Sequence, residues 1–204
     1  MYGVNMGKVS SDLIEFVKSK EGFESKVYVC PSGYMTIGYG FRFLFEQDND
    51  KCIAPTIKVA TLPLNRVMSK SEGEWQLKRW LLYVKRQVAS RLGTEAINNL
   101  QDYQLESLTS IAYNTGVAGL FKNTELINEV KTNPNSLKIR TLIKNVSKNN
   151  KSLARRREGE ANFYYGGGAN SSSNDNGAIR TVSVSEQQVS FSNTNDCERI
   201  ICEN

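Results

Sequence analysis

A helix that runs directly into a β-hairpin between residues 10 and 40 constrains the fold of this chain most strongly. The segment SSDLIEFVKSKE has apolar residues at helical spacing, with Asp12 and Glu15 as the expected capping box, and Gly22 ends the helix. Two short strand patterns then flank the turn sequence PSG. The later patterns are helical and lie near residues 69–92, 95–114, 123–131, 136–147 and 152–165. This order predicts an α+β fold that is mainly helical.

Glu21 is the last residue of the first predicted helix. It lies four residues after Val17 and eight after Leu13, so it continues the apolar stripe and is expected to face inward or into a cleft. The negative end of the helix dipole and partial burial both favour the protonated carboxyl, which suits a general acid. A plain surface glutamate in a Lys/Glu-rich turn is the competing interpretation.

Two further polar residues lie at opposite ends of the hairpin. Cys30 follows the first strand pattern and Thr36 lies in the second, so both could face Glu21 across a groove. Such a set can hydrolyse a bond without a metal, a cofactor or a histidine, and the chain contains no histidine. Taken singly, Cys30 is typical of a small buried hydrophobic residue and Thr36 of an ordinary strand residue.

The pattern Glu21-x8-Cys30-x5-Thr36 and the TIGYG run resemble the phage-type lysozymes, glycoside hydrolase family 24. Three later stretches resemble helices of that family in the same order: SKSEGEWQLKRWLLYVKRQV, LQDYQLESLTSIAYNTGVAG and SLARRREGEANFYY. The resemblance covers residues 10–165. The chain departs from the family pattern at Phe41, where the family usually has histidine, and over residues 41–68.

The resemblance implies a lysozyme-like two-lobed fold, in which a small N-terminal β-hairpin lobe joins a helical lobe in a catalytic domain over residues 1–165. It implies an endolysin or muramidase that cuts the β-1,4 bond between N-acetylmuramic acid and N-acetylglucosamine of peptidoglycan. Lysis of bacteria and an antimicrobial or defensive effect would follow, and no cofactor or metal is expected. Two alternatives stay open: a lytic transglycosylase, and a non-catalytic cell-wall-binding component of a phage or injection apparatus.

The resemblance also implies roles for individual residues. Glu21 would protonate the glycosidic oxygen, while Cys30 and Thr36 hold and activate the water that attacks from the other face, which favours an inverting reaction. Arg155 matches the family arginine expected to pair with the catalytic glutamate. That pair would favour the carboxylate, against burial and the dipole, and the sequence leaves the balance open. Family positions that line the sugar groove are matched loosely by Tyr113, Asn114 and Thr124.

Residues 166–204 differ in composition from the rest of the chain. They begin with GGGANSSSNDNG, which is typical of a flexible linker, and predict either a disordered extension or a small docking or wall-binding appendage. The whole chain has a net charge of +5, concentrated in residues 1–165, which suits association with a negatively charged cell envelope. The sequence contains no nucleic-acid-binding motif, so no nucleic-acid partner is expected.

The sequence shows no segment that is apolar enough to span a membrane and no signal-peptide pattern. We therefore expect a monomer that stays in the host cytoplasm until release through a separate holin-type pore and then acts in the periplasm or cell wall. A mature form whose signal has been removed is the alternative. The four cysteines lack zinc-ligand spacing, although two near the end could close a small loop outside the cytoplasm. They are Cys30, Cys52, Cys197 and Cys202.

Overall fold

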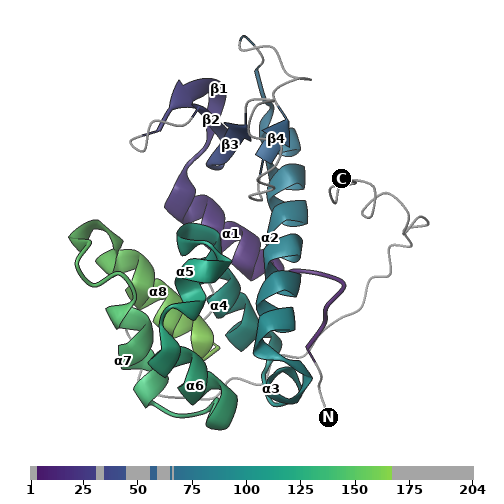
Figure 1. The fold of residues 1–204 in the computed structure, drawn as a ribbon. Helices are drawn as coiled ribbons and strands as arrows, with labels where there is room; N and C mark the ends of the chain where they lie inside the picture. The colour runs from purple at the N-terminus through teal and green to yellow at the C-terminus, as the bar shows by residue number, and fades with distance from the viewer. Residues whose placement is uncertain (1–3, 31–34, 45–55, 59–64, 66, 167–204) are drawn as a thin grey trace.

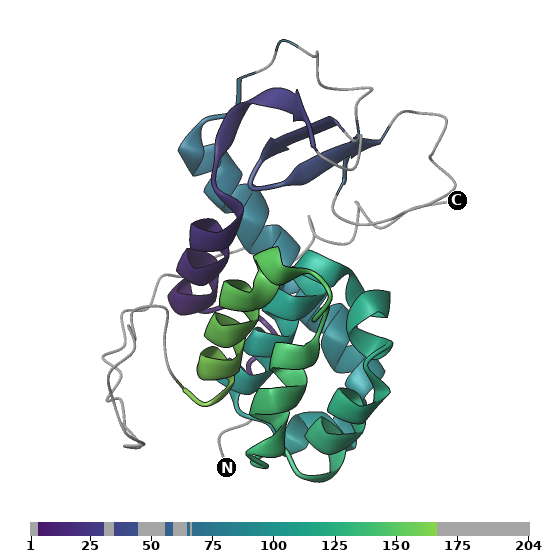
Figure 2. The same ribbon diagram turned by 90° about the vertical axis from the view of Figure 1, so that its left-hand side faces the viewer.

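The computed structural model divides the chain into a small sheet at one end and a helical body at the other (Figures 1 and 2). The long helix α2, Lys70–Leu92, reaches from the sheet to the far end of the body. The predicted tail after Gly166 lies outside the described residues, as do Cys52, Cys197 and Cys202. The structure describes residues 4–30, 35–44, 56–58, 65 and 67–166.

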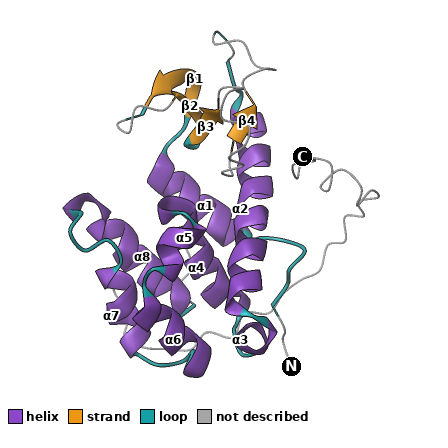
Figure 3. Ribbon diagram, viewed as in Figure 1, coloured by secondary structure: helices purple, strands orange, loops and turns teal. Residues whose placement is uncertain are grey.

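The sheet contains the predicted hairpin and extends beyond it (Figure 3). The hairpin strands β1 and β2 pair antiparallel, β3 pairs antiparallel with β2, and β4 adds in parallel to β3. The last two strands were not predicted, because the sequence after the hairpin lacks the family pattern. The strands are β1 (Glu24–Val29), β2 (Met35–Gly38), β3 (Phe41–Leu44) and β4 (Thr56–Lys58).

Helix α1, Ser11–Glu21, is the predicted first helix, but its cap differs from the prediction. The Ser10 hydroxyl accepts a hydrogen bond of 3.1 Å from the backbone N–H of Leu13, so Ser10 is the N-cap and the predicted box of Asp12 and Glu15 is wrong. Gly22 follows the helix at φ +70°, a conformation that favours glycine, and turns the chain into β1.

The remaining helices form the body around α4. The predicted helix over 95–114 is in fact two helices, because the chain turns before α4. At this turn the backbone N–H of Gln101 donates a hydrogen bond of 2.9 Å to the side chain of Gln104. Helix α5 was not predicted. The helices after α2 are α3 (Thr94–Asn98), α4 (Asp102–Thr115), α5 (Val117–Phe121), α6 (Thr124–Thr132), α7 (Lys138–Asn145) and α8 (Ala154–Tyr164), with a 3-10 turn at Lys151–Leu153 before α8.

Two apolar clusters stabilise the two ends of the molecule, and α8 belongs to both. Phe163 packs against Phe16 of α1, with ring centroids 5.8 Å apart, in the cluster beneath the sheet. Tyr164 is buried in the cluster of the helical body. Because α8 is held between the two clusters, its polar side chains lie close to the end of α1. Among the described residues, no helix is both long and apolar enough to cross a membrane.

Candidate active site

Glu21 lies where the helical body meets the sheet. Its side chain is 21% exposed, and Oε1 accepts a hydrogen bond of 2.6 Å from Nη1 of Arg156 on α8. A partly exposed carboxylate with one oxygen bound by a buried arginine can still reach a substrate with its other oxygen. The structure therefore favours the inward-facing interpretation of Glu21 over a plain surface residue.

The expected partner of Glu21, Arg155, is exposed, and the ion pair is made by the next residue. The prediction of Arg155 is wrong by one position. Helix α8 begins at Ala154, and each helical residue turns the side chain by about 100°. Arg156 therefore points inward, where only 6% of its side chain is exposed, while Arg155 faces solvent.

Thr36 and Cys30 both belong to the sheet side of the site. Thr36 is buried in β2 and lies directly opposite Tyr28 of β1, so the two side chains share one face of the hairpin. Cys30 follows β1 and is half-buried. Burial raises the pKa of Tyr28, and Cys30, Glu21 and Glu24 raise it further, so Tyr28 lies within electrostatic reach of two predicted catalytic residues. Sequence reasoning missed Tyr28, although its place two residues before Cys30 could have indicated it.

The turn between β2 and β3 brings backbone close to the Glu21 carboxylate. Gly40 has φ +84°, and a Cβ added there would lie 3.6 Å from Oε2 of Glu21. The Tyr113 hydroxyl on α4 donates a hydrogen bond of 2.6 Å to the carbonyl of Tyr39 in the same turn. Burial raises the pKa of Tyr113 well above its usual value, and the Glu21 charge adds to the rise while Arg156 opposes it.

The other two predicted sugar-binding residues are placed differently. Asn114, next along α4, accepts a hydrogen bond through Oδ1 from Nη2 of Arg157. Thr124 is exposed at the start of α6, and none of the polar contacts among the described residues joins it to Glu21. Tyr113 and Tyr28 thus lie near Glu21, whereas Asn114 contacts Arg157.

A buried carboxylate that the sequence analysis missed lies behind Arg156. Glu160 is fully buried, and its carboxylate accepts hydrogen bonds from Arg156, Arg157 and Ser110. The run RRREGE indicates an ion pair within a helix, because Glu160 lies three residues after Arg157 and four after Arg156 and so shares their helix face. Without a reason to bury that face, the run is typical of a solvated helix.

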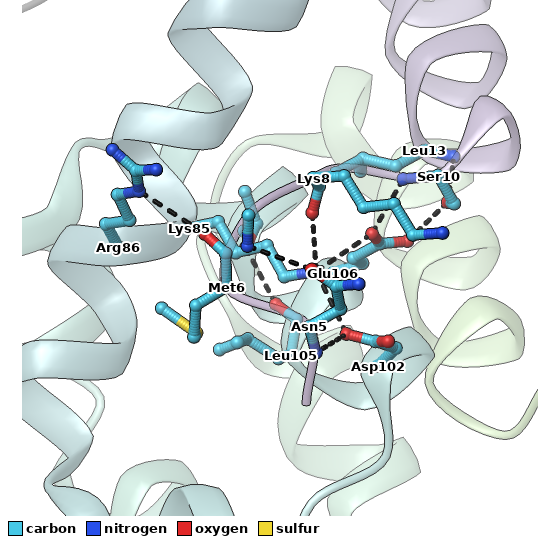
Figure 4. Close-up of polar contacts among 12 residues, drawn as sticks. Asn5, Met6, Lys8, Ser10, Leu13, Lys85, Arg86, Asp102, Leu105 and Glu106 are labelled. Carbon is cyan, nitrogen blue, oxygen red and sulfur yellow. Dashed lines mark hydrogen bonds and ion pairs between the residues drawn. The ribbon is translucent and has the colours of Figure 1, made fainter. Parts of the chain in front are cut away.

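The first turn of α1 is held by a second set of buried charges (Figure 4). The backbone N–H of Ser10 donates a hydrogen bond of 2.8 Å to the side chain of Glu106, which is 3% exposed. Lys85, 1% exposed, donates to Glu106 at 3.1 Å, to Asp102 at 3.0 Å and to the carbonyl of Lys8 at 3.1 Å. Residues of the helical body therefore fix both ends of α1, the helix that carries Glu21.

A separate hollow between the first turns of α1 and α2 holds none of the predicted site residues. Its lining includes the half-exposed ring of Trp75, which carries the Arg79 guanidinium 4.5 Å from its centroid. The hollow is lined by Ser11, Ile14, Glu15, Ser71, Glu74, Trp75 and Lys78.

A model of the family described as phage lysozyme matches residues 18–160, a range that includes Glu21, Cys30, Thr36 and Glu160. The chain belongs to the phage lysozyme family. It is accordingly a glycoside hydrolase that acts on peptidoglycan, and the family match does not favour the transglycosylase or the non-catalytic alternative.

Solved structures confirm the predicted lysozyme-like fold. The muramidase domain of SpmX from Asticaccaulis excentricus is 19% identical, with a TM-score of 0.57 over 77% of this chain and 97% of that one. A mutant of P22 lysozyme is 20% identical, with a TM-score of 0.56 over 77% and 97%. An endolysin from Escherichia coli O157:H7 phage FAHEc1 is 20% identical, with a TM-score of 0.53 over 79% and 95%. Among curated proteins, no sequence gives a significant match.

Proposed function

We propose that Glu21 is the general acid of a muramidase that cuts the β-1,4 bond between N-acetylmuramic acid and N-acetylglucosamine. The observation that carries the assignment is the pairing of Glu21 with buried Arg156 at the junction of the two parts of the molecule. Arg156 binds Oε1, which leaves Oε2, beside Gly40, as the oxygen that delivers the proton. Protonation of the glycosidic oxygen lets the bond to the sugar carbon break as positive charge develops on the ring.

Cys30 and Thr36 hold the attacking water on the opposite face of the sugar. Thr36 only orients this water, because its hydroxyl does not lose its proton near neutral pH and so cannot act as a general base. Cys30 contributes a hydrogen bond and the shape of the water site. Addition of this water to the sugar carbon, with release of one water proton to the solvent, gives the product with inverted configuration.

Tyr113, Asn114 and Thr124 line the groove that takes the glycan strand. Tyr113 supports this role by its place beside Glu21, where it also holds the Tyr39 turn. Asn114 binds Arg157 through its carbonyl oxygen, which leaves its amide N–H groups for a sugar acetamido or hydroxyl group. Thr124 offers an exposed hydroxyl at the start of α6.

The remaining proposals concern delivery. The protein acts as a monomer, stays in the host cytoplasm until release, and needs a separate holin-type pore to reach the wall. The net charge of +5 supports fast, salt-sensitive association with an anionic envelope. The domain boundary near residue 165 and the tail after it belong to the same set of proposals.

Clearing of purified peptidoglycan by Glu21→Gln tests the central assignment. Glutamine fits the same site but carries no acidic proton, so clearing should fall at least ~100-fold. Glu15→Gln is the matched control, because Glu15 lies on the same helix in an exposed ion pair with Lys18. Near-normal clearing by folded Glu21→Gln protein would refute the general acid. Mass analysis of the released muropeptides separates the reactions, since 1,6-anhydro ends would identify a transglycosylase.

A further inference from the structure

Arg156 is shared between two carboxylates. Its Nη1 donates 2.6 Å to Oε1 of Glu21, and its Nε donates 3.1 Å to Oε1 of Glu160. Its remaining terminal nitrogen, Nη2, is buried and has no hydrogen-bond partner among the described residues. The orientation of this guanidinium in front of Glu21 therefore depends on Glu160.

Glu160 is itself held from two directions. The Ser110 hydroxyl on α4 donates 2.7 Å to Oε1 of Glu160, and the Ser107 hydroxyl donates 2.7 Å to its backbone carbonyl. Arg157 donates to the other carboxylate oxygen. A fully buried carboxylate with partners on its own helix and on α4 is fixed in place, and it transmits that order to Arg156.

Charge balance in this cluster depends on the protonation of Glu21. With Glu21 ionised, two carboxylates face two arginines, Arg156 and Arg157, and the cluster is neutral. Protonation of Glu21 leaves one excess positive charge. Without the Glu160 charge, the same step would leave two excess positive charges, which a buried cluster tolerates poorly.

We infer that Glu160 is a positioning residue for glycoside hydrolysis: it orients Arg156 in front of Glu21 and balances the charge of that guanidinium. This inference rests on the proposed role of Glu21 as the general acid. Burial lowers the pKa of Arg156, but the charges and hydrogen bonds of Glu21 and Glu160 outweigh it and raise that pKa overall. Arg156 thus stays charged between the two carboxylates.

The other groups near Glu21 do not replace Glu160. Tyr113 from α4 and Tyr28 from β1 both have raised pKa values, so they are neutral at the pH of the cell wall. On α1 itself, Lys18 is engaged by Glu15 and Glu74, and Lys20 lies over the Phe16 ring at 5.1 Å. Cys30, which follows β1, raises the pKa of Tyr28. Beyond Glu21, Glu160 is the carboxylate with a described hydrogen bond to Arg156.

The test compares Glu160→Gln with Glu158→Gln in the full chain. Glu158 lies on the same helix, is exposed and pairs with Lys144 at 2.7 Å, so its replacement should leave the pH–activity profile unchanged. For Glu160→Gln, the alkaline limb of kcat/KM for peptidoglycan should move to lower pH by about one unit. KM should change little, because Glu160 is buried and touches no substrate. An unchanged limb in folded Glu160→Gln protein overturns the inference.

Arg157→Gln keeps the inference testable if Glu160→Gln does not fold. Arg157 pairs with the second oxygen of Glu160, so its loss removes one positive charge from the cluster. The alkaline limb of kcat/KM should therefore move to higher pH. The double variant Arg157→Gln/Glu160→Gln loses one charge of each sign and should return the limb toward that of the parent protein. A shift to lower pH in Arg157→Gln contradicts the inference. If Glu21→Gln stays active, the proposed function fails instead, so the two failures are distinguishable.

Discussion

The hydroxyl of Tyr113 and the carbonyl of Tyr39 form a hydrogen bond of 2.6 Å that joins α4 to the turn between β2 and β3. The next residue in that turn, Gly40, lies beside Oε2 of Glu21, the oxygen that Arg156 does not bind. The contact therefore connects the helical body to the backbone that shapes the acid site.

Tyr113→Phe should lower peptidoglycan clearing by about tenfold, because the turn beside Glu21 loses its link to α4 and small misplacements reduce rates strongly. The matched control is Tyr165→Phe, since the Tyr165 hydroxyl donates an equally long bond of 2.6 Å to the carbonyl of Ser136. Both variants should lose about 1 kcal/mol of stability. Equal clearing by the two variants would show that the Tyr39 turn does not matter for activity.

The raised pKa of Tyr113 predicts a loss of stability at alkaline pH. The fold favours the neutral phenol, so the contribution of Tyr113 to stability is fully present below its unfolded pKa of about 10. This contribution is lost as the pH rises toward the folded pKa, because Tyr113 ionises first in the unfolded chain. The free energy of unfolding should therefore fall above about pH 10 in the parent protein. It should fall less steeply in Tyr113→Phe, measured by urea denaturation across that range. Parallel pH curves for the two proteins would contradict the prediction.

Cys30→Asp should retain substantial clearing activity, because a carboxylate at this position can also hold the attacking water by a hydrogen bond. Cys30→Ala should lose more, since no group remains to hold the attacking water. Clearing rates of the two folded variants at equal concentration provide the measurement. If the aspartate variant is as inactive as the alanine variant, the thiol has a role that a carboxylate cannot fill.

Lys85→Met should destabilise the protein by about 3–5 kcal/mol, because it leaves the buried Glu106 carboxylate without its cation. Arg86→Met is the control: Arg86 is exposed and donates to the carbonyl of Met6 in the same N-terminal segment. Urea denaturation should show a much smaller loss for the control. The double variant Lys85→Met/Glu106→Leu should recover part of the stability, and failure to recover would assign the loss to packing or to the lost Glu106 acceptor of the Ser10 N–H instead of the unpaired charge.

Gly38→Ala and Gly93→Ala should differ in their effects on stability, although both glycines have positive φ, +66° and +89°. At Gly93 the new Cβ meets open space, so only backbone strain of about 1–3 kcal/mol applies. At Gly38 it would come within 2.8 Å of the Phe41 ring and the Met68 sulfur, which adds about 1–3 kcal/mol of overpacking. Thermal unfolding of the two variants measures this difference, and equal losses would show that the core beneath the sheet yields.

Local sequence patterns predicted the parts of the fold whose cause is local. The end of α1 at Glu21, the hairpin that carries Thr36 and the start of α2 all follow from short signals such as a capping serine, a turn sequence and an alternating strand. The Ser69 hydroxyl caps α2 by accepting a hydrogen bond of 3.2 Å from the backbone N–H of Glu72. The break before α4 was missed because the apolar pattern continues through it.

Long-range contacts in the site could not be predicted from spacing. Whether Arg155 or Arg156 faces Glu21 depends on which face of α8 packs against α1 and α4, because successive side chains of a helix point about 100° apart. Burial of Glu160 depends on the two serines of α4, about 50 residues earlier in the chain. No periodicity within the segment RRREGE contains that information.

The buried ion cluster also restricts how this protein can evolve. Replacement of Arg156 alone would leave Glu21 and Glu160 facing each other, and replacement of Glu160 alone would leave two arginines without their common partner. Each single step leaves a buried charge without its partner, and replacement of the whole set by apolar residues would also remove the proposed acid, Glu21. A lineage that carries this cluster is expected to inherit it as one block, while the exposed positions around it diverge freely.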